Sequence, residues 1–128
     1  MKYMLLIYHD ERGFMQLSED ERQGMYSEYR KLREELVSNG SFISGSQLQP
    51  AATATSVRVM NGKRIVTDGP FAETREQLGG FFMINANDLD EAIKIAEGIP
   101  AGRWGGVEIR PVIEVPSLPK EPLLAAKS

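Results

Sequence analysis

Cysteine does not occur among the 128 residues of this chain, and histidine and tryptophan each occur once. The missing thiols exclude disulfides, thiolate metal sites and cysteine nucleophiles, and they are compatible with a reducing cytoplasm, where we expect the protein to reside. With one histidine, mainly carboxylates remain as metal ligands, and runs such as Glu19-Asp20-Glu21 have no recognisable ligand spacing. We therefore expect no bound metal.

The chain carries only a small net charge: the formal value is −3 at pH 7, and basic residues are interleaved with acidic ones. Proteins that bind nucleic acid or an anionic membrane usually carry a basic patch, so we expect neither partner. The apolar run over residues 1–8 is too short for a signal peptide or a membrane span. Glycine fingerprints of dinucleotide and phosphate sites do not occur, nor does the G-x-S-x-G motif of serine hydrolases, so we expect no cofactor.

Hydrophobic periodicity and turn residues divide the chain into alternating strands and helices. Ser18 and Glu21 have the spacing of a capping box at a helix start, and Asp88 with Glu91 repeats it. Asn61-Gly62 is typical of a two-residue hairpin turn. The predicted elements, in order, are a strand over 3–8, a loop over 10–17, a helix from 18 to 39–40, a strand over 41–49, a hairpin of 56–60 and 63–67, a strand over 81–86, a helix from 88 to about 98, and a strand over 107–115.

This order predicts one α+β domain over residues 1–116: a ferredoxin-like βαββαβ arrangement with an inserted β-hairpin, and both helices on one face of an antiparallel sheet. The strand over 3–8 is apolar on both faces, so the second face of the sheet also needs a cover. The economical cover is the same face of a second copy, which predicts a homodimer. Pro111 predicts either an edge position for the last strand or a bulge within it. Residues 117–128 are expected to be an extended or partly disordered tail.

Residues 68–82, D-G-P-F-A-E-T-R-E-Q-L-G-G-F-F, combine a sharp turn, a charged segment and a glycine pair. Asp68-Gly69-Pro70 is typical of a tight chain reversal, because glycine tolerates positive φ and proline fixes φ at about −65°. The run resembles the signature of the DGPF proteins, a branch of the YCII-related family, and the resemblance extends from Tyr3 to Pro116. It implies a dimeric α+β barrel and, because the family's chemistry is largely unassigned, no particular reaction.

Two residues are candidates for acid–base chemistry. His9 has the same strand parity as residues 3, 5 and 7, so it is either a general base facing a cleft between the sheet and a partner subunit or a partly exposed residue at the strand end. Asp68 either orients an imidazole or accepts a substrate proton, or it is a turn residue that bonds its own backbone two residues on. Gly79-Gly80 is either a hinge or a site of close backbone packing. The residues that we expect to line the pocket are Tyr8, Ser44, Ser46, Phe71 and Arg75.

The resemblance also includes a departure. Relatives in the wider YCII group carry a histidine–aspartate pair, and the positions that align with this pair here hold Tyr29 and Asn39, neither of which replaces a neutral-pH base or an anion. Two functions remain open. One is a cofactor-independent enzyme that uses acid–base chemistry on a small molecule in a cleft at the dimer barrel, like the lactone isomerases and monooxygenases that share this barrel. The other is a non-catalytic regulatory module that binds a ligand or a protein, since DGPF proteins resemble companions of extracytoplasmic-function sigma factors.

The positions of His9 and Asp68 relative to each other distinguish the two functions. An enzyme would place His9 and Asp68 in one enclosed cavity, within reach of a buried substrate. A regulatory module could leave them apart and use an exposed apolar groove.

Overall fold

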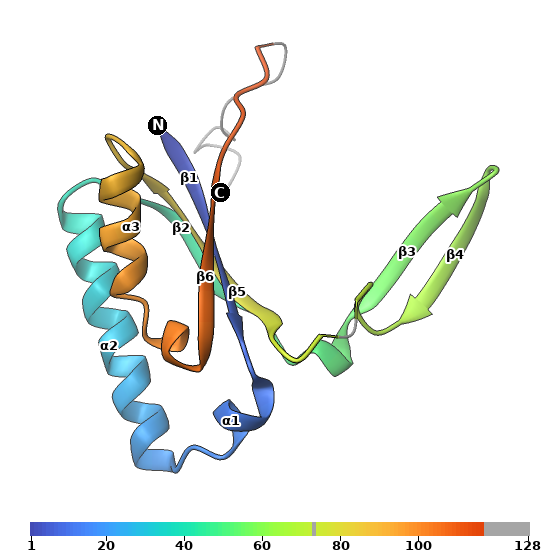
Figure 1. The fold of residues 1–128 in the computed structure, drawn as a ribbon, viewed down its shortest axis with the longest axis horizontal. Coiled ribbons are helices and arrows are strands. Elements are labelled where there is room, and N and C mark those ends of the chain that lie inside the picture. Colours follow the sequence, from blue (N-terminus) through green and yellow to red (C-terminus); the bar gives the residue numbers. More distant parts are fainter. Residues whose placement is uncertain (73, 117–128) are drawn as a thin grey trace, which may run out of the picture.

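The computed structural model describes residues 1–72 and 74–116, which form a four-stranded sheet with helices on one side and a two-stranded hairpin (Figure 1). The strands are β1 (Lys2–His9), β2 (Phe42–Gln47), β3 (Thr55–Met60), β4 (Lys63–Asp68), β5 (Gln77–Asn85) and β6 (Gly105–Pro111). The α-helices are α1 (Glu11–Met15), α2 (Glu19–Ser38) and α3 (Leu89–Glu97), and short 3-10 helices span Ala51–Thr53 and Pro100–Trp104. The tail predicted over 117–128 lies outside the described residues.

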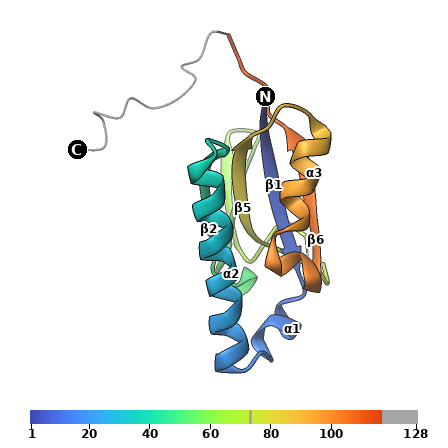
Figure 2. The same ribbon diagram turned by 90° about the vertical axis from the view of Figure 1, so that its left-hand side faces the viewer.

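The four-stranded sheet has the strand order β2-β5-β1-β6, and each neighbouring pair is antiparallel. Helices α2 and α3 both lie on one face of it, as Figure 2 shows. This order and this layering confirm the ferredoxin-like α+β fold predicted from the sequence. Strand β6 lies at the edge of the sheet and ends at Pro111 rather than at residue 115, so the edge position predicted from the proline is confirmed.

Strand β1 lies inside the sheet, and its alternating side chains separate the two faces. Leu5 is fully buried and Ile7 is 4% exposed beneath the helices, whereas Leu6 and Tyr8 on the opposite face are only half-buried. Because burying an aliphatic side chain stabilises a fold by about 1.5–3 kcal/mol, the helix-covered face carries the core. Other members of this core are Leu36, Phe82, Ile84, Ala92 and Ile99.

Helix α2 begins where the sequence predicts. The Ser18 hydroxyl accepts a hydrogen bond from the Glu21 backbone N–H (3.1 Å), and the Glu21 carboxylate accepts one from the Ser18 backbone N–H (3.0 Å). This reciprocal capping box satisfies two donors that a helix start leaves unpaired. Gly40 follows the helix with φ +82°, the left-handed conformation that ends many helices.

Two stretches differ from the prediction. Residues 11–15, predicted as loop, form helix α1, because the Asp10 carboxylate accepts a hydrogen bond from the Arg12 backbone N–H (3.0 Å) and caps the first turn. A helix this short has too few residues for a visible periodicity. Strand β5 begins at Gln77 rather than at residue 81, so Gly79-Gly80 lies inside a strand and is not a hinge.

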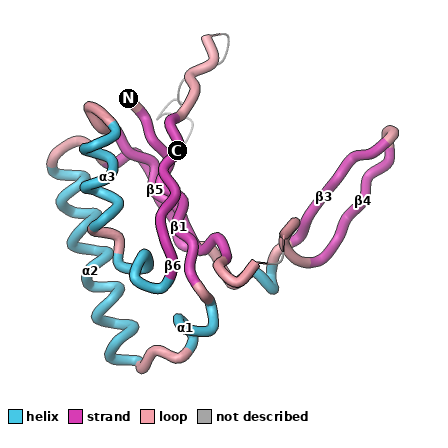
Figure 3. The backbone as a smooth tube through the Cα atoms, viewed as in Figure 1, coloured by secondary structure: helices cyan, strands magenta, loops and turns pink. Residues whose placement is uncertain are grey.

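Strands β3 and β4 form the predicted hairpin, which projects away from the sheet and the helices (Figures 1 and 3). Asn61 (φ 52°) and Gly62 (φ 74°) both have positive φ, as a type I′ turn requires. Val57 pairs with Val66 and Val59 pairs with Arg64, so the three valines share one face of the ribbon. All three are more than half exposed, so this face carries an uncovered apolar patch among the described residues, with Arg64 beside Val59.

Candidate functional site

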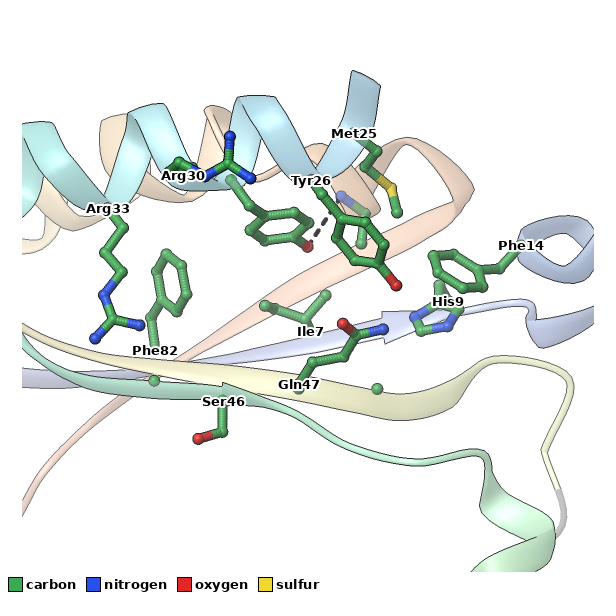
Figure 4. A pocket seen from close by; sticks show the side chains of 15 residues that line it. Ile7, His9, Phe14, Met25, Tyr26, Arg30, Arg33, Ser46, Gln47 and Phe82 are labelled. Atoms are coloured by element: carbon green, nitrogen blue, oxygen red, sulfur yellow. Dashed lines mark hydrogen bonds between the residues drawn. The ribbon is translucent and has the colours of Figure 1, made fainter. Parts of the chain in front are cut away.

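A cavity of about 310 Å³ lies between α2 and the helix-covered face of the sheet. This volume is at the lower end of the range of about 300–1,000 Å³ that is typical of small-molecule sites. Figure 4 shows α2 above the cavity and the strands below it. His9 and Phe14 lie at one end, Arg33 and Phe82 lie at the other, and Ile7 lies between them.

His9 closes one end of this cavity. It is the last residue of β1 and is 9% exposed, and its ring centroid lies 5.4 Å from that of Phe14 on α1. Its Nδ1 atom is shielded from solvent and has no hydrogen-bond partner among the described residues. Burial lowers the pKa of the imidazole below the usual 6.5, and the nearby charges of Glu11 and Asp10 oppose this shift. A neutral imidazole at neutral pH can accept a proton from a bound molecule.

A β-bulge at Gly79 makes room for the imidazole. Ile7 pairs with Gly80 but Tyr8 pairs with Leu78, so Gly79 is the extra residue of β5. A Cβ atom on Gly79 would lie 2.0 Å from Cε1 and 2.5 Å from Nδ1 of His9, which is closer than non-bonded atoms can approach. Gly79, in the second half of the run over residues 68–82, therefore contributes to the site by leaving the space that the His9 ring occupies. This close packing was one of the two alternatives derived from the sequence.

Helix α2 supplies the roof of the cavity. The Tyr26 hydroxyl points toward His9 in Figure 4, while the Tyr29 hydroxyl accepts a hydrogen bond from the Ala101 backbone N–H (3.3 Å). The Tyr29 ring also packs edge-on against Phe82, with ring centroids 6.2 Å apart, and burial raises the pKa of its hydroxyl. Tyr29 is therefore held in a fixed position as part of the wall. It is the residue that, according to the resemblance, stands where the wider YCII group carries a histidine.

Strand β2 forms one side of the cavity, and its side chains alternate across it. Gln47 points into the cavity, whereas the Ser46 side chain points away from it in Figure 4, so Ser46 lines the cavity through its backbone. Gly45 lies on the same face of β2 as Gln47 and pairs with Phe82, and a Cβ atom there would lie 2.6 Å from Cδ1 of Phe82. The glycine therefore lets the Phe82 ring sit against β2.

Asp68 does not line this cavity. It is the last residue of β4, pairs with Thr55 across the hairpin ladder and is exposed. The turn interpretation also needs correction, because the residue two positions on is Pro70, which has no N–H for the carboxylate to bind. The turn is fixed instead by the Gly69 backbone, whose N–H donates to Ala54 O (2.7 Å) and whose carbonyl accepts from the Ser56 hydroxyl (2.6 Å).

The other residues predicted to line the pocket lie elsewhere. Tyr8 and Ser44 lie on the open face of the sheet, and Phe71 is 65% exposed with the Arg58 guanidinium 4.5 Å from its ring centroid. Arg75 lies in a more open hollow at the base of the hairpin, where its Nε is 3.6 Å from an Asp10 carboxylate oxygen. The structure therefore brings together His9 and the backbone of Ser46, and it separates both from these four residues and from Asp68.

Several cavity residues were not identified from the sequence. On α2 they are Tyr26, Arg30 and Arg33, which with Tyr29 occupy the i, i+3, i+4 and i+7 positions of one helical stripe. That spacing is visible in the sequence, but two of the four side chains are charged, and the four lie beside Met25, Leu32 and Leu36, which pack into the interior. Phe14 was hidden in the stretch predicted as loop.

Among residues 1–72 and 74–116, no group of three or more histidine, cysteine, aspartate and glutamate side chains is placed to hold a metal ion. In the same part of the chain, no helix is both long and apolar enough to cross a membrane.

Two comparisons with known proteins concern nearly the whole domain. The family model of the YCII-related domain matches residues 1–116. An uncharacterised protein of Rhizobium meliloti (strain 1021) is 34% identical over 114 residues, which cover 88% of this chain and 92% of that protein. Neither match names a substrate or a reaction.

Proposed function

We propose, from the premise that this chain belongs to the YCII-related family, that the cavity beneath α2 binds a small organic molecule. In this proposal His9 moves a proton to or from the bound molecule. One observation carries this proposal: a buried imidazole whose Nδ1 has no partner among the described residues closes an otherwise largely apolar cavity. Buried polar atoms in proteins are nearly always hydrogen-bonded, so this nitrogen needs a partner from outside the described residues, which a water molecule or a bound ligand in the cavity would provide.

The cavity offers the groups that general acid–base chemistry needs. The neutral His9 imidazole is the base, and the Tyr26 hydroxyl and the Gln47 amide are donors that can hold a substrate oxygen beside it. Phe14, Ile7 and Phe82 keep water away from much of the remaining surface, which strengthens polar interactions inside. We assign no role to Asp68 in this chemistry, because it does not line the cavity.

The protonation of His9 can be measured directly, because a single histidine gives one imidazole Cε1–H signal in an NMR spectrum. We expect this signal to titrate below 6.5, since burial disfavours the charged ring. The folded pKa lies below the unfolded one, so the unfolded state binds the proton first as the pH falls. The free energy of unfolding should therefore be unaffected above about pH 6.5 and decrease as the pH drops through the interval between the two pKa values.

The His9→Gln variant is the control for this titration, because it keeps a polar side chain of similar size and removes the titrating group. Its free energy of unfolding should lose the component of the pH dependence just described. A wild-type signal that titrates at or above 6.5 would contradict the proposed neutral base.

A homodimer is proposed on separate grounds. Leu6, Phe81 and Met83 lie side by side on the open face of the sheet, where each is only half-buried. A second copy covering this face would bury them, as the sequence predicts. We expect Leu6→Asp to give a folded monomer, and Leu5→Asp, on the helix-covered face, to unfold the chain by burying a charge. Sedimentation velocity with circular dichroism measures both effects, and a folded dimer of the Leu6→Asp variant would argue against this interface.

The second candidate function is a non-catalytic module that binds another protein, such as a sigma factor. The exposed valine face of the β3–β4 hairpin favours it, because uncovered apolar patches often mark interaction sites. The same NMR experiment separates the two functions. If no small molecule shifts the His9 signal and its pKa is ordinary, the cavity is not a reaction site and the binding module is favoured.

A further inference from the structure

The charge in the cavity indicates what kind of molecule it accepts. Arg30 and Arg33 are both among the lining residues, and no aspartate or glutamate of the described chain lines the cavity. Most of the remaining wall is apolar or aromatic. A site with cationic side chains and no carboxylate favours an anion, and the apolar wall favours a hydrophobic body attached to it.

Neither guanidinium is used by an ion pair within the described residues, where the salt bridges join other arginines to acids. Both arginines are exposed, so they lie at the rim of the cavity, and the guanidinium carbon of Arg33 lies 4.8 Å from the centroid of the Phe42 ring on β2, a contact that favours one orientation of this side chain. A guanidinium stacked on an aromatic ring still presents its N–H edge, which matches the geometry of a carboxylate. The Phe42 ring therefore favours an orientation in which Arg33 can bind an anionic group at the rim of the cavity.

The charged end and the candidate base lie at opposite ends of the cavity. In Figure 4, Arg33 and Phe82 lie at one end and His9 and Phe14 at the other, with Ile7 and Tyr26 between them. A molecule with a carboxylate at Arg33 would extend its apolar part over Ile7 and present its far end to His9. Its anionic group would thus be separated from its reacting atoms.

We infer that the ligand of this cavity is a small apolar carboxylate, aromatic or branched aliphatic, whose carboxylate is bound by Arg33 with help from Arg30 and whose reacting end contacts His9. This inference rests on the proposed function and adds the chemical class of the ligand. Recognition by an arginine is charge-assisted and can be bidentate, so it distinguishes a carboxylate from a neutral amide of the same shape.

The test uses three probes with one apolar body: 3-phenylpropanoate, 3-phenylpropanamide and 3-phenylpropylammonium. Each is titrated into the full chain while the His9 Cε1–H signal is followed by NMR. We expect the acid to bind about tenfold or more tightly than the amide, and the ammonium compound to bind least, because hydrogen bonds to a charged group are the stronger ones. Bound acid should shift the His9 signal.

Arg33→Gln should weaken the acid about tenfold and leave the amide nearly unchanged. Arg33→Lys should recover part of that loss, since it keeps the charge but not the planar fork. The matched control is Lys31→Gln, which removes one positive charge from the same helix at an exposed position outside the cavity. Circular dichroism verifies that each variant is folded.

The outcomes distinguish this inference from the proposed function. Acid and amide binding equally, Lys31→Gln acting as strongly as Arg33→Gln, or no binding by any probe would each overturn the inference. Amide binding that shifts the His9 signal would leave the proposed function standing without the anion preference. Arg33-dependent acid binding that never moves the His9 signal would support the ligand class and contradict proton transfer by His9.

Discussion

Replacing Gly105 by alanine should destabilise the fold by about 2 kcal/mol or more, the upper part of the range for overpacked sites. A Cβ atom at this position would lie 2.1 Å from the Tyr8 carbonyl oxygen and 2.7 Å from the His9 Cα atom. Both contacts are to the backbone of β1, which cannot rotate away, so β6 would have to move from its partner strand. Thermal and urea unfolding measure the loss.

Gly106→Ala is the matched control, because it adds the same methyl group one residue further along the same strand. A Cβ atom at Gly106 would have no atom within 4 Å, so this variant should unfold within about 0.5 kcal/mol of the wild type. Equal stability of the two variants would mean that β6 does not approach β1 as closely as described.

Gly79→Ala should displace the His9 imidazole and destabilise the chain by about 1–3 kcal/mol, because the new methyl group and the ring cannot occupy the same space. The displaced ring should be better solvated, so its pKa should rise toward 6.5, which the NMR titration of the single histidine reports. Binding of small molecules in the cavity should weaken in parallel.

A double-mutant cycle isolates the cause of this effect. In a His9→Ala background the space opposite Gly79 is open, so Gly79→Ala should cost much less there than in the wild type. Without the clash, alanine is even favoured, since it restricts the unfolded chain. Additive losses in the cycle would show that the Gly79 substitution acts on the bulge itself and not on the imidazole.

The fold could be predicted because its main signals are local. The capping box at Ser18, the N-cap at Asp88 and the turn at Asn61-Gly62 each depend on a few neighbouring residues, and all three occur in the structure, although at Asp88 the Glu91 carboxylate accepts a hydrogen bond from the Asn87 side chain and the predicted box is not reciprocal. The parity of β1 also put His9 on the same face as residues 3, 5 and 7, as in the structure, but the cavity that it faces lies beneath α2 and not between the sheet and a partner, where the cleft was predicted. What the local pattern could not provide was the bulge at Gly79, because a bulge changes strand register only relative to a partner strand.

The candidate site was predictable only in part, because it depends on how the helix, the sheet and the hairpin lie relative to one another. Tyr26 and Arg33 lie on the helix stripe beside the core stripe, and whether that stripe faces solvent or a cavity depends on how far α2 stands from the sheet. Asp68 is a second residue whose position the sequence could not give, although it lies in a prominent motif. The hairpin carries this residue to an exposed position outside the cavity, and no sequence pattern gives the direction in which a hairpin projects.

The position of β1 between β5 and β6 determines when the sheet can form during protein synthesis. Leu5 pairs with Phe82 on one side and with Ile109 on the other, so both neighbours of this strand are synthesised long after it. A chain leaving the ribosome can form α2 early, yet β1 has no partner strand until β5 has emerged and lacks its second neighbour until β6 follows. Long-range pairing of this kind slows folding, so the newly made protein depends on late segments to conceal its most apolar strand.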